Sequence, residues 1–104
     1  MEVILKPGFL NEGHHRLNIP AQYIEIIQAA FNQGPVRLVL GNGEKEIAVI
    51  PTDNAVFQNH NAFNSQQINK WIQQNGFGEY EQGHPPSLVF ELGVTLTFKR
   101  QENH

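Results

Sequence analysis

Side-chain amides dominate residues 53–75, and amides suit the recognition of other molecules. Eleven of these 23 residues are Asn or Gln, and only Asp53 and Lys70 carry a full charge. An amide holds a donor and an acceptor in one plane, so it can match the polar edge of a ligand. Asn and Gln bind adenine in DNA in this bidentate way. The segment is therefore either a recognition surface or a polar loop that runs into an amphipathic helix.

A second polar segment, residues 6–16, contains Asn11, His14 and His15. Like residues 51–65, it leaves one predicted strand and enters another. The two polar segments are either unrelated surface loops or a pair of loops that bind one ligand from two sides.

The histidines do not have the spacing of metal ligands. His14 and His15 are adjacent, so they cannot point at one ion from a strand, and His60 and His84 lie in separate predicted loops. The chain has neither an HExxH motif nor any cysteine, and these supply the usual zinc ligand sets. We therefore expect no metal and no other cofactor.

Residues for covalent or acid–base catalysis are not arranged in a known pattern either. Ser65 and Ser87 lack the GxSxG turn that activates a serine. Glu44 and Glu46 share a strand face, but acids beside Lys45 are typical of a solvated surface. We therefore expect a binding protein that is not an enzyme.

Length and composition predict one ordinary globular domain. The chain has 104 residues, of which 39% are hydrophobic and 16% charged, and this favours a folded domain with a modest core. No basic n-region precedes an apolar run, and no apolar run is long enough to cross a bilayer. We therefore expect a cytoplasmic location and no membrane partner.

The charge balance argues against nucleic acid without deciding the question. The formal net charge is −3, whereas phosphate neutralisation by Lys and Arg supplies most non-specific DNA affinity. The local field on the binding face matters more than the total. Several acids fall late in the chain, where they could lie away from such a face.

Apolar periodicity and turn residues predict how these segments are positioned. We expect strands over residues 2–5, 16–19, 36–40, 44–50, 87–91 and 94–99, and helices over residues 21–31 and from Asn64 or Ser65 to about 75. The pair 36–40 and 44–50 is a hairpin around Gly-Asn-Gly. Ile68, Trp71 and Ile72 form one apolar helix face. The order lacks βαβ units, so it predicts a mostly β fold with two short helices (α+β), a small barrel or sandwich plugged at its ends.

Three segments follow one another in a recognisable order: residues 13–20 (GHHRLNIP), residues 64–71 (NSQQINKW) and residues 87–92 (SLVFEL). They resemble segments of the B3-like pseudobarrel DNA-binding domains, most closely the effector (DNA-recognition) domains of restriction endonucleases. Their order and spacing fit over nearly the whole chain. The resemblance implies an open pseudobarrel with two arms, roughly residues 9–16 and 53–67, that enter the major groove of duplex DNA.

The family's DNA contacts correspond to named positions in this chain. The resemblance implies contacts from His14 or, one place on, His15, from Lys45, and from Asn61, Phe63, Asn64, Ser65, Gln66 and Gln67. Several of the later positions are basic or acidic in the related effector domain and neutral here. Asn and Gln in their place favour adenine over guanine.

Combining the residues with the resemblance, we predict sequence-specific binding of double-stranded DNA by a module without a catalytic site. Base edges would be read by Asn11, His14, His15, Gln58, Asn59, Asn61, Asn64, Ser65, Gln66 and Gln67. Phosphates would be bound by Arg16, Lys45 and Lys70. Any cleavage would belong to a nuclease domain or subunit that acts as a partner. The alternative is a protein- or carbohydrate-binding β-barrel that uses the same Asn-, Gln- and His-rich loops.

Overall fold

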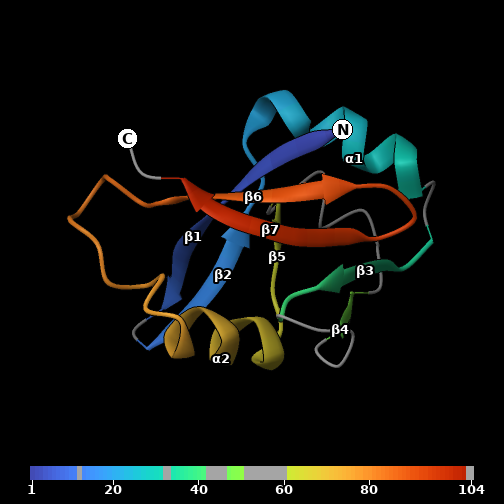
Figure 1. The fold of residues 1–104 in the computed structure, drawn as a ribbon. Helices are drawn as coiled ribbons and strands as arrows, with labels where there is room; N and C mark the ends of the chain where they lie inside the picture. Colours follow the sequence, from blue (N-terminus) through green and yellow to red (C-terminus); the bar gives the residue numbers. More distant parts are fainter. Residues whose placement is uncertain (12, 32–33, 42–46, 51–60, 103–104) are drawn as a thin grey trace.

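Alternating apolar residues and tight turns divide the chain into strands that pair in one sheet. The computed structural model describes residues 1–11, 13–31, 34–41, 47–50 and 61–102 (Figure 1). Its elements are β1 (Glu2–Asn11), β2 (His14–Asn18), α1 (Ala21–Phe31), β3 (Val36–Val39), β4 (Ile47–Ile50), β5 (Ala62–Phe63), α2 (Gln66–Gln74), β6 (Ser87–Leu92) and β7 (Leu96–Glu102).

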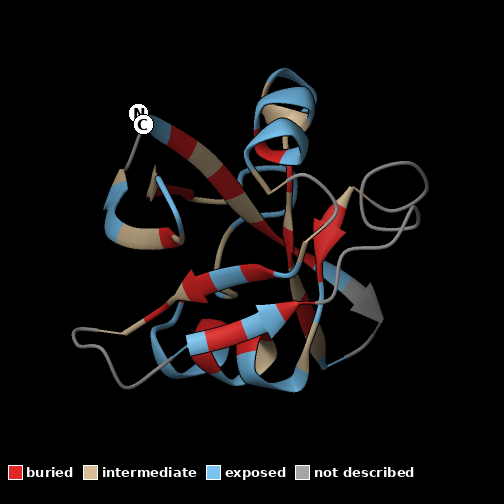
Figure 2. Cartoon of the chain, turned by 90° about the vertical axis from the view of Figure 1, so that its right-hand side faces the viewer, coloured by how far each residue is buried: buried red, intermediate tan, exposed pale blue. Residues whose placement is uncertain are grey.

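The sheet is nearly closed and barrel-like. Its strand order is β4-β3-β7-β6-β1-β2-β5, and every pair is antiparallel except β3 with β7. Figures 1 and 2 show α1 and α2 at opposite ends of the sheet. The predicted α+β fold, mostly β with two short helices, is confirmed as a pseudobarrel. No helix in the described ranges is long and apolar enough to span a bilayer.

Strand β1 is longer than the predicted strand over residues 2–5, although Pro7 and Gly8 follow that segment. Residues 2–5 pair with β6, and from Lys6 onward the strand pairs with β2 instead. Pro7 thus lies where β1 changes partner, so its missing N–H costs no bond in a continuous central ladder. Consequently β1 runs to Asn11, past a register shift that follows Phe9. The segment predicted as a loop is a two-stranded hairpin, in which β2 begins at His14.

The other local predictions are largely confirmed. Helix α1 and the β3–β4 and β6–β7 pairs lie where the patterns place them. Ser65 is the N-cap of α2, and its Oγ accepts a hydrogen bond from the Ile68 N–H at 3.1 Å. One predicted strand end was wrong: β7 continues through Glu102, beyond the predicted end at residue 99.

The core joins the apolar face of α2 to the inner face of the sheet (Figure 2). Ile68, Trp71 and Ile72 are buried, as predicted. The Trp71 ring packs edge-on against Phe77 and Phe98, with ring centres 5.1 Å apart in both cases. Because these contacts fix the face that α2 turns inward, they also fix which of its amides point outward.

Candidate functional site

The β1–β2 hairpin lies along α2, with its turn beside the C-terminal end of the helix, although the two are about fifty residues apart in the chain (Figure 1). His14 Nε2 lies 2.7 Å from Asn64 Oδ1, within hydrogen-bonding distance. We call this region, made of Gly13, His14 and the segment from Asn64 to Lys70, the hairpin–helix junction. It brings together the described ends of the two predicted arms.

Two helix amides hold this junction together. Asn69 Oδ1 accepts a hydrogen bond from the His15 backbone N–H at 2.8 Å. Gln73 Nε2 donates to the Gly13 carbonyl at 3.1 Å and to Asn69 Oδ1 at 3.3 Å. Asn69 and Gln73 are four residues apart, so they share one face of α2. These hydrogen bonds dock the helix on the hairpin, so both amides have a structural role.

The sequence alone does not reveal that Asn69 and Gln73 dock α2 on the hairpin. Their four-residue spacing in a helix was the available signal, but nothing local identifies the hairpin as the group they bind. Asn75 is likewise structural, because its Nδ2 donates to the Trp71 carbonyl at 2.8 Å at the helix end. Part of the amide bias therefore has a structural explanation.

The strands at the base of the two predicted arms, β2 and β5, are neighbours in the sheet. Leu17 of β2 pairs with Phe63 of β5, and the Ile19 N–H donates to the Asn61 carbonyl at 2.8 Å. This pairing holds both segments on one side of the barrel. The described bases of the two predicted arms therefore lie side by side.

Several of the residues predicted to contact base edges are exposed at the junction. Asn64, Gln66 and Gln67 are exposed, while His14 and Ser65 are half-buried. Gln66 and Gln67 open α2, where unpaired backbone N–H groups favour anions. The junction thus offers a cluster of amides beside a helix N-terminus.

Two predicted bases lie on the same elements. Lys70 is exposed on α2. Arg16 is half-buried on β2, and its Nε is buried without a hydrogen-bond partner among the described residues. Arg16 lies two residues after His14, so the two side chains leave β2 on the same face.

His15 and Phe63 were predicted to contact DNA, but both side chains are buried. His15 is 8% exposed, and its ring packs against Phe9 with centres 4.6 Å apart. Phe63 is 0% exposed within the core. Neither side chain can reach a base edge, because in β2 the residues alternate between solvent and core and His15 falls on the core side.

The remaining predicted contacts are described in part or not at all. Asn61 is half-buried with a φ of 51°, a left-handed conformation that Asn tolerates. For Asn11 the backbone is described, and it pairs with His14. Gln58, Asn59 and Lys45 lie outside the described residues.

Carboxylates gather at the other end of β1. The N-terminal amine lies 2.7 Å from Glu91 Oε2, and Arg100 binds Glu2 and Glu102 at 3.0 and 2.8 Å. The hydrogen bond from Arg100 holds the pKa of Glu2 below its ordinary value. Ten strand residues span roughly 30 Å, so Glu2 and its strand partner Glu91 lie far from the hairpin–helix junction.

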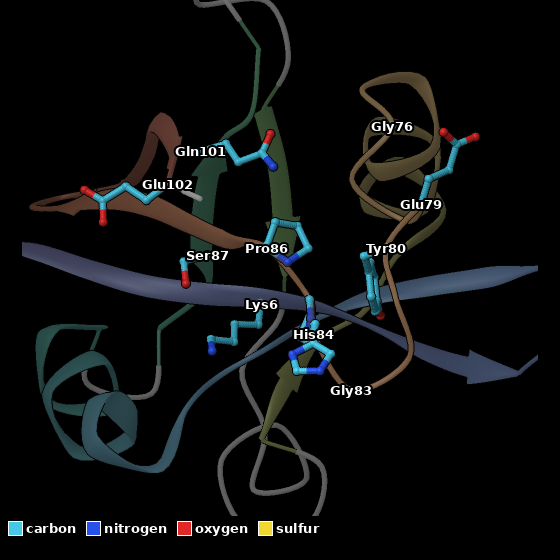
Figure 3. Close-up of a pocket in the computed structure, with 11 residues that line it drawn as sticks. Lys6, Gly76, Glu79, Tyr80, Gly83, His84, Pro86, Ser87, Gln101 and Glu102 are labelled. Carbon is cyan, nitrogen blue, oxygen red and sulfur yellow. The ribbon is translucent and has the colours of Figure 1, made fainter. Parts of the chain in front are cut away.

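A pocket of about 490 Å³ lies under the segment that follows α2 (Figure 3). It is lined by Lys6, Gly76, Glu79, Tyr80, Gly83, His84, Pro85, Pro86, Ser87, Gln101 and Glu102. Tyr80 Oη donates to the Pro7 carbonyl at 3.2 Å, and burial raises the pKa of Tyr80. Figure 3 shows His84 and Lys6 on one side of Pro86 and Gln101 on the other, so the polar groups do not converge on one point. None of the predicted recognition residues lines this pocket.

The described part of the chain contains no group of three or more His, Asp or Glu side chains placed to hold a metal ion. Comparison of the chain with models of protein families, with curated proteins and with solved structures finds no match.

Gly78 holds the segment after α2 against the hairpin, and we predict that enlarging it is destabilising. A Cβ at Gly78 would lie 2.5 Å from Cε1 of the His15 ring, which Phe9 confines from another side. Gly78→Ala should therefore lower the free energy of unfolding by about 1–2 kcal/mol. Gly93→Ala is the matched control, since nothing lies within 4 Å of its Cβ position. Urea unfolding of both variants measures the difference, and equal stabilities would contradict the packing described.

Proposed function

We propose that this chain binds double-stranded DNA sequence-specifically, as a recognition module of the B3-like pseudobarrel type. The two arms, residues 9–16 and 53–67, would enter the major groove together. The resemblance of residues 13–20, 64–71 and 87–92 to restriction-endonuclease effector domains first indicates this function, and a mostly β pseudobarrel is compatible with it.

The observation that carries the proposal is the contact between His14 and Asn64. This contact joins the described ends of both arms on one side of the barrel. A protein that grips a duplex with two arms needs such an arrangement, and a pair of unrelated surface loops does not.

Charge is distributed in a way that favours the same conclusion. Arg16 and Lys70 lie on the two elements that form the junction, while Glu2 and Glu91 pair with cations at the far end of β1. The field at the junction can therefore be more favourable to phosphate than a net charge of −3 suggests.

Each group at the junction has a partner on the duplex. Exposed amides at Asn64, Gln66 and Gln67 would read base edges, with a preference for adenine. Arg16 and Lys70 would bind phosphates, which position the protein without specifying sequence. The first N–H groups of α2 would add a phosphate contact. His15 is left out of the proposal because its ring is buried.

The proposed module performs no chemistry of its own. Asn11, Gln58, Asn59, Asn61 and Ser65 complete the two arms in this proposal, and Lys45, which precedes the second arm, would bind a phosphate. Any cleavage of the recognised site would be carried out by a nuclease domain or subunit that this chain positions.

Selection of bound duplexes from a random pool, at two salt concentrations, tests the proposal. We expect enrichment of a defined site that contains adenine. If Arg16, Lys45 and Lys70 each neutralise a phosphate, raising the salt from about 50 to 200 mM should weaken binding about 40-fold. A pool without enrichment at either salt would contradict DNA recognition. Binding to a protein or a glycan with little salt dependence would support the alternative barrel module.

Removing one positive charge at the junction should weaken every duplex alike. Lys70→Ala is expected to reduce the slope of log affinity against log salt by about 0.9, since one phosphate contact is lost. Lys99→Ala removes the same charge from β7, near Glu2, and should leave the slope unchanged. Fluorescence anisotropy over a salt series measures both slopes. Equal changes would mean that only net charge matters, which would exclude Lys70 as a specific contact.

A further inference from the structure

We propose that His14 acts as a positioning residue, which orients the amide of Asn64 for reading a purine and does so most strongly when the imidazole is protonated. This inference rests on the proposed DNA binding and assigns roles within it. In this inference Asn64 contacts the base and His14 holds the Asn64 side chain in place, so the two residues do not contact DNA independently.

The geometry identifies which group supports the other. Asn64 is exposed, whereas His14 is half-buried on a paired strand. The backbone of the neighbouring His15 is tied to Asn69 at 2.8 Å. His14 therefore stands on a framework that is fixed to α2, while Asn64 precedes the N-cap of that helix and has the freer side chain.

The hydrogen bond determines how the Asn64 amide faces a ligand. With a proton on Nε2, His14 donates to Asn64 Oδ1 across 2.7 Å. The Asn64 Nδ2 group then points away from His14 as a donor, and Oδ1 keeps a second lone pair. A donor beside an acceptor matches N7 and N6 of adenine. The ligand class at this position is accordingly a purine, with adenine preferred.

Protonation of His14 leaves one possible orientation for the Asn64 amide. Neutral His14 can carry its proton on Nδ1 instead, and a rotated Asn64 amide could then donate to Nε2. A protonated imidazole has donors on both nitrogens, so only the Oδ1 atom of Asn64 can bind it. The charge also strengthens the hydrogen bond and attracts phosphate. Binding should therefore be tighter when the imidazole of His14 carries a proton on both nitrogens.

The charged groups around His14 must be known before a pH dependence of binding is assigned to it. In their described parts, β1, β2 and α2 carry Lys6, Arg16 and Lys70 near it, with Glu2 at the far end of β1. The segment after α2, which packs against His15 through Gly78, adds the carboxylates Glu79 and Glu81. His15 is the other imidazole, and it lies on the core side of β2. A variant that changes His14 alone separates the two histidines.

A double-mutant cycle on the selected duplex tests the inference. His14→Ala should weaken binding roughly three- to tenfold, because a free Asn64 side chain must be immobilised on binding. In an Asn64→Ala background the same change should have almost no effect, since His14 then has no side chain to orient. Additive losses would overturn the proposal, because His14 would then contact DNA independently.

Conservative variants supply a readout that general damage to the fold would not give. His14→Gln keeps an N–H donor, so it should restore most of the affinity while removing the rise in affinity at acid pH. Asn64→Asp keeps an oxygen for His14 but removes the outward donor, so it should lose the purine preference. A His14→Gln variant that keeps the wild-type pH profile would overturn the role of protonation.

NMR of the free protein separates this inference from the proposed function. The ring-nitrogen shifts of His14 should report an Nε2–H donor, and the Asn64 side-chain amide signals should move when His14 is replaced by Gln. Unchanged amide signals would overturn the pairing, whether or not DNA binds. If the pairing is present and no duplex is selected, the DNA-binding proposal fails and the orienting role in base reading fails with it.

Discussion

Trp71→Ala should lower the free energy of unfolding by about 3–5 kcal/mol, the largest effect we expect from a single substitution. Trp71 is 3% exposed and contacts the rings of Phe77, Phe90 and Phe98. Removing the indole leaves a cavity between α2 and the sheet, and it also removes the contacts that anchor the helix. A domain of this size is typically stable by about 5–15 kcal/mol, so the substitution would remove a large share of the total stability.

Urea unfolding followed by circular dichroism measures this loss. Val94→Ala is the control, because Val94 is 93% exposed in the β6–β7 turn and such changes usually fall within about 0.5 kcal/mol. A loss below about 1 kcal/mol for Trp71→Ala would contradict the aromatic core. The more conservative Trp71→Phe should fall between the two, so the series remains informative if the alanine variant does not fold.

Gln66→Ala should weaken binding to the selected duplex by about 1–3 kcal/mol, the cost of losing a bidentate base contact. Gln66 is exposed at the first turn of α2, next to the junction contact between His14 and Asn64. The substitution should also relax the base preference at one position of the site. Affinity measured on the selected duplex and on its single-base variants gives both quantities.

Gln74→Ala is the matched control for this prediction. Gln74 is exposed on the same helix and has the same chemistry, but it lies at the C-terminal end of α2. Alanine is a better helix former than glutamine by only a small amount, so both variants should fold like the wild type. Equal affinities for the two variants would mean that the start of α2 is not the reading surface.

Local patterns in the sequence were sufficient for the elements themselves. The apolar spacing of Ile68, Trp71 and Ile72 predicts both the helix and its buried face, because a helix repeats every 3.6 residues. Ser65 predicts where the helix begins, since its hydroxyl can satisfy an N–H group at the N-terminus. The Gly-Asn-Gly sequence predicts a hairpin whose strands are both found. All of these signals act between residues that are close in the chain.

Only the tertiary structure decided how those elements use their polar residues. Pro7 predicts a strand end, yet β1 passes through it because the strand exchanges β6 for β2 at that point. Asn69 and Gln73 resemble their neighbours in the sequence, but they bind the hairpin more than fifty residues away. His15 and His14 are adjacent and identical, and one is buried while the other reaches Asn64. The composition thus determined that amides would be plentiful, and long-range strand pairing and helix docking decided which of them remain free, because the partner of a polar side chain is set by contacts that no local pattern contains.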